Sequence, residues 1–342
     1  MSALVLRRGS VVSVERPGPA AELTVEVEGE QRRAVSYESM TGPVEPGDDV
    51  VVNTAALDLG LGSGGFDVVH VNLTRGLEGT GTEGAHVMKL NYSSLQHAVH
   101  PVEEQAPALD GEHGAPLRGR PVAVISLHGQ LPCVAWAAGQ RRPGARIGYV
   151  QTAGGALPGQ LSHVVRDLLE RGLLAGHITA GPAFGGEHEA ISTAGGLHAG
   201  IRALGWDAAI AGPGPGILGS ATALGHGGIA ALDSAHAAQA LGGTALIVPR
   251  MSSGDPRPRH RDLSHHSATV LRLLLRPAIV AVPEELEMPG PHEYRTGRAD
   301  LDGYLESGLP ARTMGRGPAE DDLFFRASLA GGSVLGGLID GV

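Results

Sequence analysis

The sequence has little cysteine, few aromatic residues and no excess of basic charge. The single cysteine, Cys133, excludes a disulfide within the chain and fits a reducing compartment, so we expect a cytoplasmic protein. Aromatic residues make up only 3% of the chain, so the core must be built from Leu, Val, Ile and Ala. The net charge of −10 argues against a protein that coats nucleic acid.

Long apolar runs are also missing. No stretch has the ~20 consecutive apolar residues that a membrane span needs, and the most apolar stretch, residues 277–283, has the length of a strand. The first residues carry no basic stretch ahead of a long apolar run, so we expect neither a signal peptide nor membrane binding. The 342 residues are enough for one large or two medium domains with ample core.

The N-terminal part of the chain has the pattern of a small β domain. Segments of alternating polar and apolar residues, such as 9–15 and 22–28, are separated by turn residues such as Pro46-Gly47. Short strands at this spacing predict a small antiparallel β-barrel, which we place in residues 1–80. Some barrels of this size bind oligonucleotides, but the acidic charge and the few aromatics favour a structural or docking role here.

From Pro121 onward apolar runs alternate with helical segments. This order predicts an α/β domain, a doubly wound, mostly parallel Rossmann-like sheet, over residues 121–283. Residues 81–120 are predicted to form a linker and cleft segment, and 284–342 a C-terminal cap with a helix over 318–329. The strands are expected at 122–127, 146–150, 177–180, 208–211, 245–249 and 278–282. The loops at their carboxyl ends should carry the site.

A glycine-rich turn follows the fourth of these strands. Its glycines, Gly214, Gly216 and Gly219, match the dinucleotide-binding spacing GxGxxG. The match departs from that fingerprint because it follows the fourth strand, and because the next strand ends at Arg250 where an acid would bind ribose. A tight packing turn is a second reading. A third is that the turn holds another anion, through Gly216, Gly219, Ser220 and Thr222.

The segment from Arg250 to His266 carries the most chemistry. Guanidinium groups bind phosphate or carboxylate in a bidentate fork, and a helix start adds free amides. We therefore predict that Arg257, Arg259, His260 and Ser264 bind an anion, with Ser264 also capping the helix. His265 and His266 in the first turn should be neutral and able to transfer protons or bind a metal. The alternative is a solvated loop whose arginines pair with acids.

Two other strand ends supply candidate catalytic side chains. His128 follows the first strand of the α/β domain, and Glu187 lies in the loop after the third, beside His188 and Glu189. Both could move protons. Cys133 with a histidine would make a nucleophilic pair, but a cysteine in an apolar helix is more often a packing residue. The spacing of His and Glu matches no metal motif, so we assign no metal site.

Several of these segments resemble one family. The segments that show the resemblance are the run His128-x-Gln-Leu-Pro132, the segment 219–225 and Ser264-His-His266, together with 88–92 and 314–317. They resemble an uncharacterised bacterial family, the domain-of-unknown-function family numbered 3866. The resemblance covers most of the chain and implies no activity.

The residues therefore predict a site but leave the reaction open. The leading hypothesis is an enzyme that acts on a small anionic or phosphorylated metabolite at the carboxyl edge of the sheet. Arg257 and Arg259 would hold the anion, and the catalytic candidates are His128, His265, His266 and Glu187. The alternatives are a non-catalytic ligand sensor or scaffold, and a nucleotide-dependent oxidoreductase. The cofactor is unknown, and self-association stays open.

Overall fold

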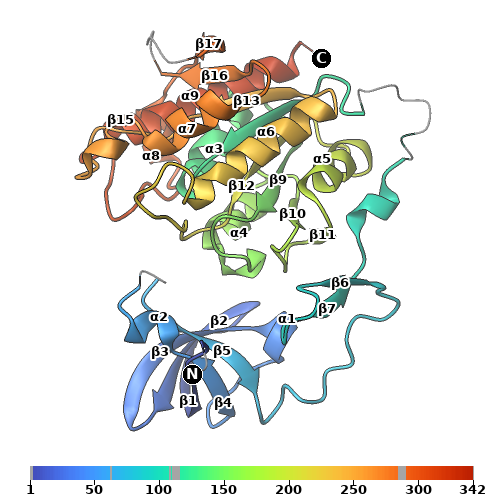
Figure 1. Cartoon of the computed structure of the whole chain (residues 1–342), viewed down its shortest axis with the longest axis vertical. Coiled ribbons are helices and arrows are strands. Elements are labelled where there is room, and N and C mark those ends of the chain that lie inside the picture. The colour runs from blue at the N-terminus through green and yellow to red at the C-terminus, as the bar shows by residue number, and fades with distance from the viewer. Residues whose placement is uncertain (1–2, 62–63, 108, 110–115, 284–289, 342) are drawn as a thin grey trace. The chain divides into compact units, whose positions relative to one another are not determined.

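The computed structural model describes residues 3–61, 64–107, 109, 116–283 and 290–341. The chain divides into two compact units, residues 1–100 and 101–342. Figure 1 shows the barrel strands of the first unit and the helices and sheet of the second. Each unit has its own apolar core and is described by itself.

The first unit is a closed five-stranded barrel with strand order β1-β2-β3-β5-β4, which confirms the predicted barrel. Its strands are β1 (Leu6–Arg16), β2 (Ala20–Val27), β3 (Glu30–Tyr37), β4 (Asp49–Asn53) and β5 (Asp67–Asn72). Neighbouring strands are antiparallel except β3 and β5, whose parallel pairing closes the barrel. Alternate residues of the strands point inward, so Leu23, Val25, Val50 and Val52 form an aliphatic core.

Short elements surround the barrel strands. They are the helical turns α1 (Glu38–Thr41) and α2 (Ala55–Asp58) and the paired strands β6 (Val87–Lys89) and β7 (His97–Val99). Two buried carboxylates brace the barrel: Asp67 accepts from Arg32, and Asp48 accepts from Arg75 and Asn72. Each buried charge thus has a partner, as burial requires.

The second unit contains an eight-stranded sheet with the order β11-β10-β9-β12-β8-β13-β16-β17. Every neighbouring pair in it is parallel. The strands are β8 (Pro121–Ile125), β9 (Ile147–Thr152), β10 (His177–Ala180), β11 (His188–Ala190), β12 (Ala208–Pro213), β13 (Thr244–Val248), β16 (Ile279–Val282) and β17 (Glu293–Thr296). Strands β8, β9 and β12 are buried along their whole length, which explains why β8 and β12 lack the polar alternation of a half-exposed strand.

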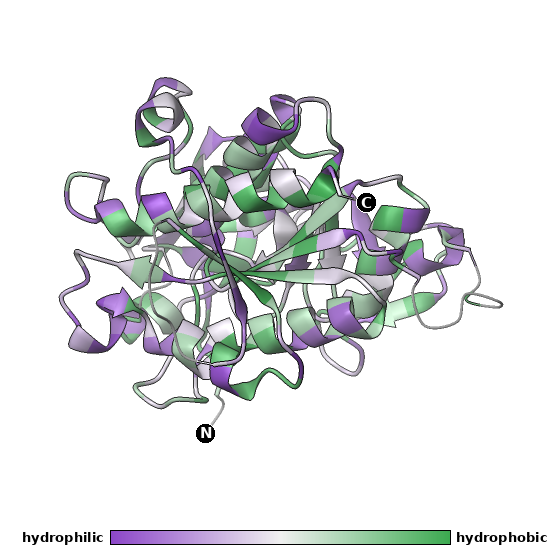
Figure 2. Cartoon of the chain, turned by 90° about the horizontal axis from the view of Figure 1, so that it is seen from above, coloured by the Kyte–Doolittle hydropathy of each residue, from purple (hydrophilic) through white to green (hydrophobic). Residues whose placement is uncertain are grey.

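Helices cover both faces of this sheet. One face packs against α3 (Leu131–Arg141), α4 (His163–Glu170), α8 (Leu301–Glu306) and α9 (Asp322–Ile339). The other packs against α5 (Thr193–Arg202), α6 (Ala230–Ala240) and α7 (His265–Leu273). Strand β8 serves both cores, since Ala123 and Ile125 point to the first and Val122 and Val124 to the second. In Figure 2 the strands are largely green and the outlying loops carry more purple. The doubly wound α/β prediction is confirmed.

The C-terminal helix α9 is a core element of the second unit. Within the described residues it is the one helix long and apolar enough to cross a membrane by length and composition, a candidate that the sequence analysis did not single out. Of its residues, 67% are buried, and it packs against α3 and the sheet. A Cβ atom on Gly332 would lie 2.3 Å from the carbonyl oxygen of Val134, so glycine is what lets the two helices approach.

The observed units differ from the predicted segments. The expected linker 81–120 is divided between the units, because β6 and β7 belong to the first unit and Pro101 begins the second. The expected cap is not a separate domain, because β17 extends the sheet and α9 completes its core. The predicted helix 318–329 starts at Asp322 and continues to Ile339. Residues 110–115 of the expected linker and 284–289 of the expected cap lie outside the described residues.

Candidate active site at the carboxyl edge

The loops after β8, β12 and β13 meet at the carboxyl edge of the sheet. His128, after β8, contacts the carbonyl oxygen of Pro213, the last residue of β12, at 3.3 Å. Gln130 donates to the carbonyl oxygens of Val248 and Pro249 at the end of β13. The side-chain oxygen of Gln130 also accepts from the backbone N–H groups of its own loop. This amide therefore connects the carboxyl ends of β8 and β13 by hydrogen bonds.

The loop after β9 is hydrogen-bonded to the loop after β12. Leu218 N–H donates to the carbonyl oxygen of Gly154, and Ala156 N–H donates to that of Pro215. Gly154 has a φ of 113° and its backbone lies so close to Gly227 that a Cβ atom there would be 2.4 Å from the carbonyl oxygen of Gly227. Only glycine suits both the backbone conformation and the close approach.

The connections leave this edge toward opposite faces of the sheet. Strands β8 and β9 lead into α3 and α4 on one face, whereas β12 and β13 lead into α6 and α7 on the other. Strand β12 lies between β9 and β8. In doubly wound sheets, ligands bind where neighbouring strands diverge in this way.

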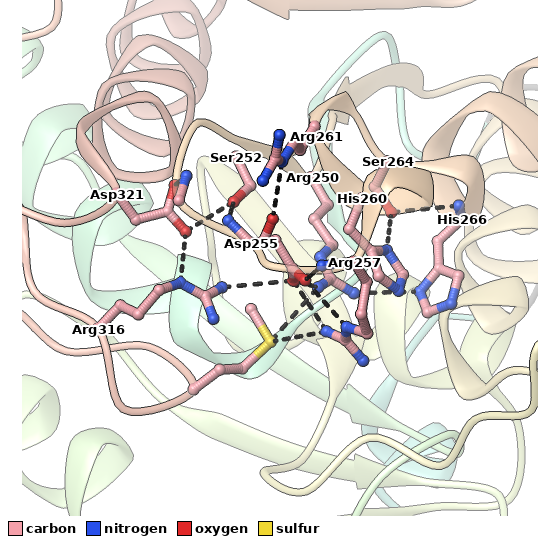
Figure 3. Close-up of polar contacts among 12 residues, drawn as sticks. Arg250, Ser252, Asp255, Arg257, His260, Arg261, Ser264, His266, Arg316 and Asp321 are labelled. Carbon is pink, nitrogen blue, oxygen red and sulfur yellow. Dashed lines mark hydrogen bonds and ion pairs between the residues drawn. The ribbon is translucent and has the colours of Figure 1, made fainter.

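Beside this point lies an ionic network of three guanidinium and two carboxylate groups (Figure 3). Its members are Arg250, Arg257, Arg316, Asp255 and Asp321, called the arginine–aspartate network below. Asp255, fully buried, accepts from all three arginines, with Arg257 forming a two-bond fork. Asp321, also buried, accepts from Arg316 and Ser252. The network therefore carries one positive charge in excess.

Burial and charge act against each other in this network. Burial alone would raise the pKa of Asp255, but the bonds and charges of Arg257 and the charge of Arg250 hold it well below its usual range. Burial and the charges of Arg257 and Arg316 lower the pKa of Arg250 to about 10, against the opposing effect of Asp255. The Nε atom of Arg250 is buried without a hydrogen-bond partner among the described residues. The positive charge here is thus incompletely compensated.

Four imidazole rings pack together next to the network. They belong to His226, His260, His265 and His266 and are called the histidine cluster below. The ring of His226 stacks on His266 with centroids 3.7 Å apart, and His260 meets both His265 and His266 at 4.8 Å. Ring nitrogens of His260, His265 and His266 all lie within 4.8 Å of one another. His266 Nδ1 faces Nη1 of Arg250 at 3.5 Å, which joins the cluster to the network (Figure 3).

The histidine cluster is held in the neutral state. Burial and the charges of Arg250 and Arg257 lower the pKa of His260 to about 3. Burial and the nearby His226 and Arg250 lower the pKa of His266 to about 2. The pKa of His265 is lowered by burial, by His226 and by Arg259. The position at the helix start predicts neutral His265 and His266, and in the structure burial is the main cause.

His128 has a different environment from the cluster. Its Nε2 lies 2.7 Å from Oγ of Ser162, the residue that caps α4, and its Nδ1 contacts Pro213. Burial lowers the pKa of His128 to about 4, and the bond to Pro213 opposes this only in part. Both nitrogens are engaged, so His128 holds three loops together, and within the described residues no contact links it to the histidine cluster.

Glu187 also lies away from the cluster. Its carboxylate accepts from the backbone N–H of His177, the first residue of β10, and so lies at the amino end of that strand. Glu189 accepts from Thr179 and Gly185 and braces the same loop. Cys133 is fully buried in α3, and burial raises the pKa of its thiol to about 12, as a packing residue requires.

The glycine-rich loop uses the hydroxyl groups of Ser220 and Thr222 internally. The Oγ of Ser220 lies 2.8 Å from the hydroxyl of Thr222, and Ser220 N–H donates to Gly225. Helix α6 starts at Ala230, well beyond Gly219, whereas a dinucleotide fingerprint needs its glycines at the helix start. This spacing speaks against the nucleotide reading. Gly216, with a φ of 69°, serves the turn.

Among the anion-binding residues predicted in the segment from Arg250 to His266, Arg259 has a side chain without an ion pair to any described residue. It is exposed, yet it is close enough to lower the pKa of His265. Arg257 forms an ion pair with Asp255, which fits the alternative prediction of a loop whose arginines pair with acids. Ser264 caps α7 as predicted, and its Oγ also contacts His260 at 2.8 Å.

Sequence reasoning missed three members of the site. His226 lies at the end of a glycine-rich loop, and only the tertiary packing shows that it stacks on His266. Arg316 and Asp321 come from the segment predicted to form a C-terminal cap. The run 314–317, which contains Arg316, is part of the family resemblance. This resemblance is the sequence signal that could have pointed to Arg316.

The fold and site define an α/β protein with a doubly wound parallel sheet whose carboxyl edge gathers arginine and histidine side chains. The chain belongs to DUF3866, a family of proteins of unknown function. The model of this family matches residues 33–332. The match starts within β3, so β1 and β2 precede it. No curated protein and no solved structure matches the chain.

Proposed function

We propose that the second unit binds a small anionic, carboxylated or phosphorylated, metabolite beside the histidine cluster and acts on it as an enzyme. One observation carries the proposal: the arginine–aspartate network has an excess positive charge, and Arg259, which acts on His265 together with Arg250 and Arg257, has no carboxylate partner among the described residues. An anion there would offset a charge that the protein itself leaves uncompensated.

The same placement supports proton transfer. The neutral imidazole of His265 is near the guanidinium that would hold the anion. A bound anion would weaken the positive field that now depresses the pKa of the cluster, so these rings would become better bases once the ligand is present. His265 and His266 therefore stay the catalytic candidates, whereas His128 and Glu187 are left out because their contacts are structural.

The anion site is tested with inorganic phosphate and pyrophosphate as probes. A ligand at a hundred times its Kd should stabilise the second unit by about 2.7 kcal/mol, which is readable as a rise in the thermal midpoint. Arg259→Ala should weaken binding by about 10- to 100-fold, the value of a charge-assisted hydrogen bond. Arg276→Ala, another exposed arginine of the same unit, is the matched control and should bind like the wild type. Equal binding by both variants would refute the anion site.

A ligand sensor that uses the same site is the second candidate. The two differ in what happens to a ligand that co-purifies and is identified by mass spectrometry after denaturation. An enzyme converts this compound, and His265→Gln stops the conversion while phosphate binding persists. A sensor binds the compound and returns it unchanged.

A further inference from the structure

The histidine cluster contains buried nitrogen atoms that the protein does not use. Nε2 of His265 is inaccessible to solvent and has no hydrogen-bond partner among the described residues. Such orphaned polar atoms are costly in a buried site and call for an explanation. The ring of His265 packs against those of His260 and His266, with centroids 4.8 Å and 4.4 Å apart.

We propose that His260, His265 and His266 bind one divalent transition metal ion of the Zn²⁺ class. Their ligand nitrogens lie within 4.8 Å of one another. Tetrahedral coordination with Zn–N bonds of about 2.0–2.1 Å places neighbouring nitrogens about 3.3 Å apart. Nitrogens at the upper limit of 4.8 Å would therefore approach one another by about 1.5 Å when the ion binds. This site goes beyond the anion site and does not depend on it, and in the metal-loaded protein His265 and His266 would serve as ligands in place of bases.

A neighbouring hydroxyl orients His260 as metal sites require, whereas Nδ1 of His266 faces the donor Nη1 of Arg250 and would have to leave it to bind the metal. In the metal-binding tautomer, Nδ1–H of His260 donates to Oγ of Ser264 and leaves Nε2 for the metal. The stacked ring of His226 holds the plane of His266. Ser264 also caps the helix that carries His265 and His266, so one hydroxyl fixes the backbone and one of the ligands.

Three imidazoles and no carboxylate make a neutral ligand set. A tetrahedral ion with three protein ligands keeps its fourth position for water or substrate. The surrounding guanidinium groups favour an anion in that position, because an anion offsets both the metal and Arg259. Imidazole ligands select Zn²⁺, Co²⁺ or Ni²⁺ over Mg²⁺ and Ca²⁺, which prefer oxygen.

Metal binding is measured on the full chain in phosphate-free buffer, so that its result is independent of the anion site. Co²⁺ is added to chelator-treated protein, and the visible absorption of tetrahedral Co²⁺ is followed. We expect one equivalent per chain, displaced by Zn²⁺ and not by Mg²⁺. His265→Ala should weaken binding by at least the roughly 10- to 100-fold that losing an outer partner of a metal ligand costs.

His163→Ala, which removes an exposed histidine of the same unit, is the control and should bind Co²⁺ like the wild type. Should His265→Ala fail to fold, X-ray absorption of the Zn²⁺-loaded wild type decides, with three imidazole ligands expected. Absence of stoichiometric binding, equal affinity of the two variants, or fewer than three imidazoles overturns the proposal. The anion test, repeated with chelator present, then shows whether the proposed function survives alone.

Discussion

Acid should destabilise the second unit through His128, and the size of the effect follows from its burial. The pKa of His128 falls from 6.5 to about 4 on folding. The folded state thus binds fewer protons than the unfolded state in this window. The stabilising contribution is complete above pH 6.5 and is lost as the pH falls toward 4. The loss amounts to about 1.4 kcal/mol per pH unit, or about 2 kcal/mol at pH 5.

The assay is urea unfolding followed by tryptophan fluorescence at several pH values between 7 and 4.5. Both tryptophans, Trp136 and Trp206, lie in the second unit, so the signal reports on that unit alone. His128→Gln lowers stability at every pH but cannot titrate, so its free energy of unfolding should fall less steeply with acid. His163→Gln, at an exposed position, should keep the wild-type slope. If His128→Gln and the wild type show equal slopes, the reasoning is refuted.

Three further substitutions or probes test the core and the network. Gly332→Ala should destabilise the second unit by about 1–3 kcal/mol through overpacking, measured as a lower urea midpoint, whereas Gly337→Ala, with no contact closer than 3.8 Å, should be near neutral. Asp255→Asn should cost about 3–5 kcal/mol by removing the counter-charge of buried Arg250, and an unchanged midpoint would contradict the network. Cys133 should react with thiol reagents only as fast as the unit unfolds, so rapid labelling of native protein would be inconsistent with its burial.

The sheet could be predicted from the sequence because its strands are buried on both faces. Runs such as 122–127 and 208–211 have no polar alternation and match β8 and β12. The extent of α9 could not be predicted, because Gly331 and Gly332 look like a helix end in sequence. They lie inside the helix because other elements pack closely against them.

The site was predicted in outline only. Strand ends predicted His265 and His266 at the carboxyl edge, since parallel strands end at a common edge, and in the structure these residues begin α7 after β13. Whether an arginine is free or paired depends on which acid reaches it in space. The pairing of Arg257 with Asp255 and the freedom of Arg259 therefore needed the structure. The stacking of His226 had no local signal at all.

The position of β8 in the sheet has a consequence for how the chain folds. This strand is central, yet its residue Val122 pairs with Ala209 on one side and Ala245 on the other, roughly 90 and 120 residues further along the chain. During synthesis both edges of the apolar strand β8 stay unpaired until β12 and β13 have been synthesised. Unpaired edges of this kind recruit other chains, so nascent protein should be most prone to aggregate before β13 emerges.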